Sequence, residues 1–222
     1  MGALMDYLNV HGIYRHACPN CGGEVDDLRL YYGLPCRKCL PIHKPKRLNV
    51  ITIGDLLLKR GVLKDYKWFF EVEKKLRVIE EFFNKATGSR FWSSQRTWAR
   101  RVLRGKSFAI VAPTGVGKTL FGLTMSLYFA AYENAKSYII VPTTPLVIQA
   151  ESRLKQLAEK AGVNVRILVI HSRLPRKERG ERLAKLQAGD FDVLVTTSRF
   201  LQKNYSYIKN NRFSFIFVDD VD

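Results

Sequence analysis

The sequence contains no run of about 18 apolar residues, the length that a helix needs to cross a bilayer. Its first residues, Met1 to Asn9, also lack the basic-then-apolar order of a secretory signal. Internal repeats and low-complexity tracts are missing as well. These absences predict a cytoplasmic protein with no membrane attachment.

Acidic residues are scarce: 20 Asp and Glu stand against 37 Lys and Arg, so the formal net charge is +17. Such an excess is typical of proteins that bind a polyphosphate backbone. Hydrophobic residues make up 46% of the 222 residues and charged residues 26%, which is a globular rather than a disordered composition. We therefore expect one full α/β domain with a smaller appendage, and a nucleic acid as partner.

Cysteine is also rare, and its four residues are grouped. They form two Cys-x-x-Cys pairs with fourteen residues between them, Cys18-Pro-Asn-Cys21 and Cys36-Arg-Lys-Cys39. Four thiolates at this spacing suit a tetrahedral Zn²⁺ site. Because four protein ligands leave no open position, we expect a structural, non-catalytic zinc. An iron–sulfur cluster and a redox dithiol are the alternatives.

The composition changes along the chain and predicts three parts. Residues 1–47 are rich in Gly, Pro, Cys and Tyr and read as a zinc-finger module. Residues 48–90 form a linker and helical segment, because apolar residues recur three and four apart from Leu63 to Ala86. A second helix is expected over Gln95 to Leu103. Residues 91–222 form the main domain.

In that domain, short apolar runs alternate with helical patterns. Strands of this kind belong in a parallel sheet covered on both faces, so we predict a doubly wound α/β fold. The chain ends just after an apolar run, and we expect it to be part of a longer protein. The strands are expected at Phe108–Ala112, Tyr138–Val141, Arg166–Ile170, Val193–Thr196 and Phe213–Val218, and the helices at Lys118–Ala131, Leu146–Ala161, Arg176–Gln187 and Ser198–Ile208.

A glycine-rich loop lies between the first expected strand and helix, the context that a P-loop requires. Its glycines let successive N–H groups face an anion, so the loop is expected to bind ATP. Lys118 would reach the β- and γ-phosphates, and the Thr119 hydroxyl would ligate Mg²⁺. The alternative is a glycine turn without function. The loop residues are Ala112, Pro113, Thr114, Gly115, Val116, Gly117, Lys118 and Thr119.

The last expected strand is followed by Asp219-Asp220-Val221-Asp222. Asp219 is placed to hold Mg²⁺, usually through water, and Asp220 to orient or deprotonate the attacking water. An acidic turn is the other interpretation, but the pairing with a P-loop about one hundred residues earlier favours ATP hydrolysis.

Gln95 lies upstream of the loop, and its amide can pair with the two edges of an adenine. Phe91 or Trp92 could stack on that ring. An ordinary exposed Gln and a buried Trp are the alternative interpretation.

Hydroxyl groups open the helices after the second and fourth expected strands. Free N–H groups and hydroxyls at helix starts hold phosphates well, so two such places on one sheet edge could track a nucleic-acid backbone. Helix capping alone would also explain them. The candidate residues are Thr143, Thr144, Thr197 and Arg199.

Three strings together resemble one known family, reverse gyrase. The four-Cys finger that precedes them is also similar, and the likeness covers nearly the whole chain. The strings are Phe91-Trp92-Ser-Ser-Gln95-Arg96-x-Trp98, Ser107 to Thr119, and Asp219-Asp220-Val221-Asp222.

The resemblance implies a RecA-like P-loop domain with a parallel sheet, preceded by a long helix and a small zinc module. It implies a parent chain with a second RecA-like domain and a type IA topoisomerase module. That protein would couple ATP hydrolysis to positive supercoiling of DNA, in hyperthermophiles. By motif, Gln95 would contact adenine, Lys118 and Thr119 phosphate and Mg²⁺, Asp219 Mg²⁺, and Asp220 water. We expect a monomer.

The resemblance also leaves differences and competing functions. Asp220 stands where DEAD-box proteins carry Glu and is one methylene shorter, which weakens it as a base. A superfamily-two helicase with a zinc finger, and a zinc-dependent nucleic-acid-binding adaptor, are the competing functions.

Overall fold

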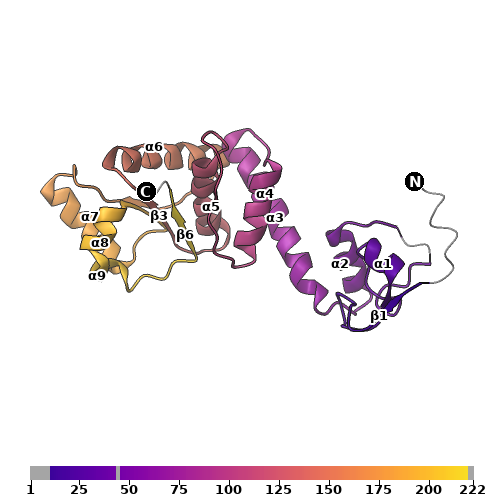
Figure 1. Ribbon diagram of the computed structural model, residues 1–222. Helices are drawn as coiled ribbons and strands as arrows, with labels where there is room; N and C mark the ends of the chain where they lie inside the picture. Colours follow the sequence, from indigo (N-terminus) through magenta and orange to yellow (C-terminus); the bar gives the residue numbers. More distant parts are fainter. Residues whose placement is uncertain (1–10, 44–45, 220–222) are drawn as a thin grey trace. The chain divides into compact units, whose positions relative to one another are not determined.

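The computed structural model describes residues 11–43 and 46–219 (Figure 1). The chain divides into two compact units, Met1–Arg77 and Val78–Asp222. The expectations for Met1 to Asn9 and for Asp220 lie outside the described residues. In the part of the chain that is described, no helix is both long and apolar enough to span a membrane.

The first unit contains a small two-stranded sheet and short helices. Side-chain caps set where the helices begin: the Asp26 carboxylate accepts from the Arg29 N–H, and the Asn49 side chain accepts from the Thr52 N–H. One apolar cluster, which includes three of the cysteines, forms the core. The elements are β1 (Ile13–Tyr14), antiparallel β2 (Val25–Asp26), α1 (Asp27–Tyr31) and α2 (Val50–Lys59).

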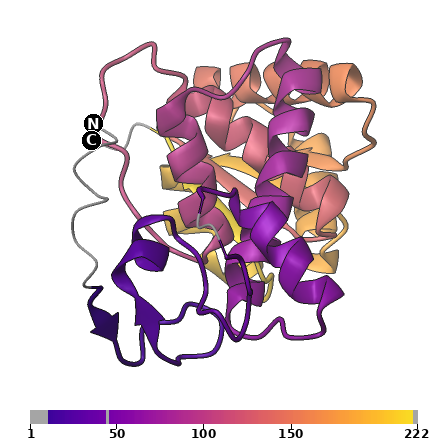
Figure 2. The same ribbon diagram turned by 90° about the vertical axis from the view of Figure 1, so that its right-hand side faces the viewer.

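A single helix, α3 (Tyr66–Thr87), passes from the first unit into the second (Figure 1; Figure 2). It confirms the long helix predicted from the apolar spacing. Leu76 and Ile79 of that stripe are fully buried. Gly88 follows the helix with a φ of +72°, a left-handed conformation that ends helices readily.

The second unit is built on a four-stranded parallel sheet, as predicted. The strand order is β4-β5-β3-β6, and every pairing is parallel. All five residues of β3 are buried, because helices cover both faces of the sheet. The strands are β3 (Ser137–Val141), β4 (Ile167–Val169), β5 (Val193–Thr197) and β6 (Phe215–Val218).

Helices on the two faces complete this α/β unit (Figure 1). Successive side chains of each strand point to opposite faces of the sheet, so each face packs against its own helices. Tyr138 and Leu194 pack with Phe200 and Ile208 of the helices after β5, whereas the P-loop helix and the next helix pack together on the other side. The helices are α4 (Ser93–Leu103), α5 (Lys118–Tyr132), α6 (Thr144–Ala161), α7 (Arg176–Ala188), α8 (Ser198–Lys203) and α9 (Tyr205–Ile208).

The strand predicted at Phe108–Ala112 is wrong. Residues 106–113 form no strand, and Val111 is 98% exposed. A strand needs a neighbour for its backbone groups, but a cavity of about 900 Å³ lies between residues 105–110 and β6. Residues 108–112 thus have the apolar pattern of a strand but lack the backbone pairing with a neighbouring strand.

Close packing of α5 on β6 gives the first prediction. A Cβ added at Gly122 would overlap the ring of Phe217. Gly122→Ala should therefore lower the free energy of unfolding by about 1–3 kcal/mol through overpacking. Gly180→Ala is the matched control, since Gly180 lies inside α7 with no atom near its Cβ direction. That control should gain up to about 1 kcal/mol, the usual helical difference between Ala and Gly. Chemical denaturation measures both, and equal effects would contradict the contact.

Candidate functional site

The P-loop connects the extended segment after α4 to the first turn of α5. Gly115 and Gly117 have φ angles of +84° and +79°, the left-handed region that suits glycine. Gly117 is also the N-cap of α5. The loop therefore bends in the manner that exposes backbone N–H groups at a helix start, where the helix dipole attracts anions.

Lys118 reaches back across this loop. Its Nζ donates a hydrogen bond to the carbonyl oxygen of Ala112 at 2.7 Å. The ammonium is thus held over the same backbone that the glycines shape. A cation in this place can stabilise negative charge brought to the loop.

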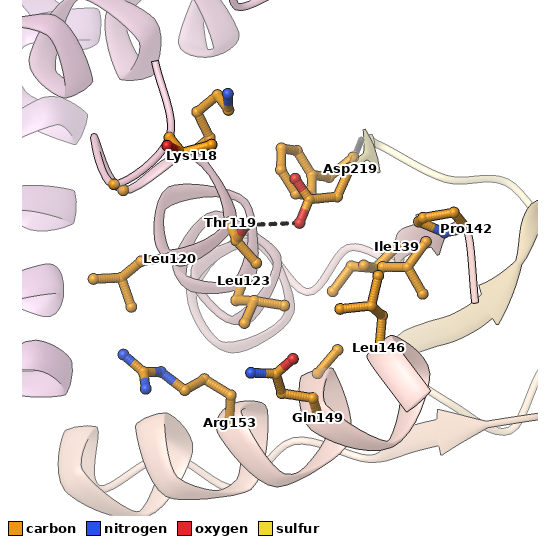
Figure 3. Close-up of a pocket in the computed structure, with 16 residues that line it drawn as sticks. Lys118, Thr119, Leu120, Leu123, Ile139, Pro142, Leu146, Gln149, Arg153 and Asp219 are labelled. Carbon is orange, nitrogen blue, oxygen red and sulfur yellow. Dashed lines mark hydrogen bonds between the residues drawn. The ribbon is translucent and has the colours of Figure 1, made fainter. Parts of the chain in front are cut away.

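Thr119 and Asp219 meet although they are 100 residues apart (Figure 3). The Thr119 Oγ1 donates to Asp219 Oδ2 at 2.7 Å. Asp219 follows β6, and its N–H extends the pairing with β3 by donating to the Ile140 carbonyl at 2.9 Å. Asp219 is only 9% exposed. A hydroxyl and a carboxylate oxygen in contact form a suitable pair for a hard cation such as Mg²⁺.

A cavity of about 500 Å³ lies beside this pair, below the P-loop and between α5 and α6 (Figure 3). Its lining changes from polar at the loop to apolar between the helices, where Leu120, Leu123 and Leu146 lie. Gln149 and Arg153 of α6 line it as well. The site is therefore an open pocket that joins the P-loop to the sheet edge.

Gln95 is buried against the P-loop rather than exposed. Its Oε1 accepts from the Trp92 N–H at 3.0 Å, which caps α4, and its Nε2 donates to the Gly117 carbonyl at 3.4 Å. Of the two aromatic residues considered with it, Phe91 packs on Phe83 with ring centroids 4.4 Å apart. Trp92 is 56% exposed. Trp92 is thus the ring that faces solvent.

The four nucleic-acid candidates lie where two neighbouring strands, β3 and β5, lead into helices α6 and α8. Val141 is opposite Thr197 in the register of β3 and β5, so Thr143 and Thr197 lie at the same sheet edge. The Thr197 side chain caps α8 by accepting from the Phe200 N–H at 3.1 Å. Thr143 is exposed and makes no side-chain cap bond to α6.

Ser172 belongs to this edge but was not foreseen. Its Oγ lies 3.2 Å from the Thr144 Oγ1, and it follows β4 closely. The sequence signal was available: a hydroxyl-bearing residue within two positions of the end of an apolar run, as in the two pairs that were recognised. Arg199 is exposed in the first turn of α8.

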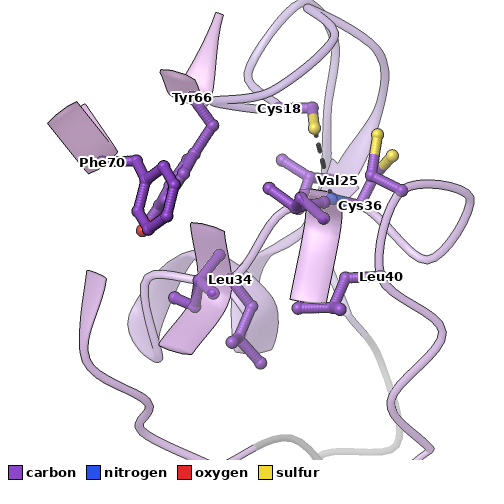
Figure 4. Packing of buried hydrophobic residues seen from close by; sticks show 10 residues of the cluster. Cys18, Val25, Leu34, Cys36, Leu40, Tyr66 and Phe70 are labelled. Atoms are coloured by element: carbon purple, nitrogen blue, oxygen red, sulfur yellow. Dashed lines mark hydrogen bonds between the residues drawn. The ribbon is translucent and has the colours of Figure 1, made fainter. Parts of the chain in front are cut away.

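The four cysteines converge in the first unit, with all sulfur atoms within 4.8 Å of one another. Cys21 Sγ and Cys36 Sγ are 3.7 Å apart. A tetrahedral zinc with bonds of about 2.3 Å requires sulfur–sulfur distances of about 3.8 Å. The Cys36 N–H also donates to Cys18 Sγ at 3.2 Å (Figure 4). The residues therefore fit a closed tetrathiolate site.

The pKa values of two of the thiols, Cys18 and Cys39, are shifted in opposite directions. Burial opposes ionisation of Cys18, but backbone N–H bonds from Cys36, Asn20 and Cys21 outweigh it and lower its pKa to about 7. At Cys39, burial raises the pKa to about 12. A bound metal ion removes such protons itself, because it stabilises each thiolate directly.

Arg29 is a fully buried residue of this unit that the sequence did not single out. Its guanidinium donates to the carbonyls of Pro35 at 2.6 Å, Leu40 at 2.5 Å and Ile42 at 3.2 Å. Pro35 and Leu40 flank the second Cys-x-x-Cys pair. Arg29 thus holds that knuckle in place and puts a positive charge near the thiolates.

Fold and loop together define a class of protein: a P-loop nucleotide-binding domain on a parallel sheet, with a four-cysteine module before it. Comparison with known families agrees with both parts. Residues 92–222 match the family described as DEAD/DEAH box helicase, and residues 10–56 match the reverse gyrase zinc finger. The chain belongs to the DEAD/DEAH box helicase family.

Curated relatives confirm the resemblance to reverse gyrase. The chain is 46% identical to the reverse gyrase of Pyrococcus horikoshii and 47% identical to that of Pyrococcus furiosus, each over 95% of this chain. It is 46% identical to reverse gyrase 1 of Aquifex aeolicus over 96% of this chain. The chain spans only 13%, 18% and 17% of these three relatives, so they are far longer proteins.

Proposed function

We propose that the P-loop binds ATP with Mg²⁺ and supports its hydrolysis. The contact of Thr119 with Asp219 is the observation that carries this assignment. Thr119 would ligate Mg²⁺, and Asp219 would hold it directly or through water. Lys118 would exchange the Ala112 carbonyl for the β- and γ-phosphates. Asp220, outside the described residues, would orient the attacking water.

The backbone of Pro113 to Gly117 would bind the phosphates through its N–H groups. Gln95 would read the adenine from its position beside the loop, with the exposed ring of Trp92 available for stacking. Because the Gln95 side-chain N–H already donates to the Gly117 carbonyl, this side chain would link adenine recognition to the conformation of the loop.

The sheet edge with Thr143, Thr144, Thr197 and Arg199 would bind the sugar–phosphate backbone of DNA. Exposed hydroxyl groups, helix starts and an Arg side chain are the groups that make such contacts. The formal net charge of +17 supports an anionic polymer as partner.

We propose further that the whole protein is a DNA topoisomerase that introduces positive supercoils, coupling ATP hydrolysis to strand passage. The match to the reverse gyrase zinc finger next to a helicase domain supports this function over that of a plain helicase. In this proposal, residues 1–47 are the zinc module, 48–90 a linker and helical segment, and 91–222 the first RecA-like domain. A second RecA-like domain and a type IA topoisomerase module would belong to the same cytoplasmic, monomeric protein.

The test uses the full-length protein and a negatively supercoiled plasmid. With ATP, two-dimensional gels should show topoisomers of positive linking difference, and Lys118→Ala should abolish them. A plain helicase would leave the linking number of a closed plasmid unchanged, and that result would contradict the topoisomerase assignment.

The 222-residue chain alone is expected to bind nucleotide but to hydrolyse it slowly. The resemblance to reverse gyrase implies that the arginine fingers belong to the second RecA-like domain. In other P-loop enzymes, such residues raise turnover by about 10³–10⁵-fold. Phosphate release by the chain, with and without DNA, should therefore stay at least about 10³-fold below that of the whole protein. Rapid DNA-stimulated turnover by the isolated chain would refute this.

A further inference from the structure

Asn20 lies inside the first Cys-x-x-Cys knuckle and is 0% exposed. Its side-chain Nδ2 donates to Cys39 Sγ at 3.2 Å and to the Val62 carbonyl at 2.7 Å. Its Oδ1 accepts from the Lys64 N–H at 2.9 Å. One buried amide thus touches a thiol of the second knuckle and a backbone segment more than forty residues away in sequence.

These bonds use the amide group fully. A carboxamide has two N–H donors, and one goes to Cys39 while the other goes to Val62. Its oxygen serves Lys64. The backbone of the same residue adds a fourth link, because the Asn20 carbonyl accepts from the Asp65 N–H at 3.2 Å. Since a buried polar group without a partner is costly, another side chain could not take this place without loss.

The segment that Asn20 holds leads directly into α3. Val62, Lys64 and Asp65 form the turn between the end of α2 and the first residue of α3, Tyr66. Two of its N–H groups and one carbonyl bind Asn20. The start of the helix that continues to Thr87 is therefore tied to the four-cysteine site through one residue.

We propose that Asn20 is a positioning residue that couples metal loading of the four-cysteine site to the order of the Val62–Asp65 turn. Metal binding makes Cys39 a thiolate, and a charged acceptor strengthens the N–H···S hydrogen bond. The strengthened bond fixes the amide, and the amide fixes the turn. By reciprocity, the turn supports the orientation in which Asn20 stabilises the metal-bound thiolate.

The first experiment compares variants of the whole chain, with zinc or cobalt alone as the probe. Asn20→Asp keeps the oxygen that accepts from Lys64 and removes both N–H donors. Asn20→Ala removes all three side-chain bonds. Both should bind metal about 10–100-fold more weakly in competition with a chromophoric chelator, the range typical of residues that support metal ligands.

Two readouts separate positioning from general stability. In the cobalt-loaded variants, the thiolate-to-cobalt charge-transfer band should shift, because one sulfur has lost a hydrogen bond. In the zinc-loaded Asn20→Ala variant, the amide of Lys64 should exchange with solvent at least about tenfold faster, since its side-chain acceptor is gone. Asn20→Asp keeps that acceptor and should protect the Lys64 amide more than Asn20→Ala does. Asn49→Ala is the matched control, as Asn49 caps α2 in the same unit through the Thr52 N–H. It should move neither readout.

A third measurement uses the wild-type chain and therefore does not depend on the folding of any variant. With ¹¹³Cd in the site, one side-chain amide proton of Asn20 should show a scalar coupling to the metal through Cys39 Sγ. A loaded chain without that coupling, or an Asn20→Ala variant that binds metal and protects the Lys64 amide as the wild type does, would overturn the proposal. None of these measurements uses ATP or DNA, so their outcome is independent of the proposed motor function.

Discussion

Lys118→Ala is expected to lower ATP turnover of the full-length protein by about 10²–10³-fold, the usual cost of removing one hydrogen-bond donor that stabilises developing negative charge. Nucleotide affinity of the 222-residue chain should fall about 10–100-fold as well, because hydrogen bonds to charged groups contribute about 1.5–3 kcal/mol. The side chain now bonds to the Ala112 carbonyl, so its loss removes no core contact. Calorimetry and phosphate release measure the two effects.

The control for this variant is Lys209→Ala, an equal change of charge at an exposed position after α9. Affinity and turnover should stay at the wild-type level there. If Lys118→Ala left nucleotide binding and the response to DNA unchanged, the protein would not be a P-loop motor, and the adaptor hypothesis would take its place.

Removal of the metal from the four-cysteine site should unfold the small module. Residues 11–43 contribute three cysteines to the buried core cluster and only Val25, Leu34 and Leu40 besides them, so few apolar side chains hold this segment without metal. Structural zinc contributes about 10–16 kcal/mol of apparent binding free energy in modules of this kind. Amides of residues 11–43 should lose protection from exchange after treatment with a chelator, and added zinc should restore it.

The second unit provides the internal control for metal removal. Residues 78–219 should keep their amide protection, because their core is built from the sheet and its helices. Cys39→Ser should reproduce the effect of the chelator on the module. A module that stays folded after quantitative removal of zinc would contradict a structural role of the metal.

The sequence predicted those features that periodicity and spacing encode. The parallel sheet followed from apolar runs, the long helix from Leu76 and its neighbours at three- and four-residue steps, and the cysteine cluster from its two pairs. Spacing also indicated that Thr119 and Asp219 share a site, but their direct hydrogen bond required the structure.

The strand at Phe108–Ala112 shows the limit of this reasoning. An apolar run reports that a segment can be buried, whereas a strand also needs a neighbour at hydrogen-bonding distance. Asn20 and Arg29 show a second limit. A single polar residue has no period, and its role depends on carbonyl and sulfur atoms that folding brings around it from distant positions.

The central claim is that the P-loop holds a nucleotide whose magnesium is shared by Thr119 and Asp219. A crystal structure of the chain with a non-hydrolysable ATP analogue and Mg²⁺ tests it directly. Lys118 Nζ should then leave the Ala112 carbonyl for the phosphates, with Mg²⁺ bound by the Thr119 hydroxyl and held at Asp219. A nucleotide bound elsewhere, or a Lys118 still bonded to Ala112 beside an occupied loop, would contradict the claim.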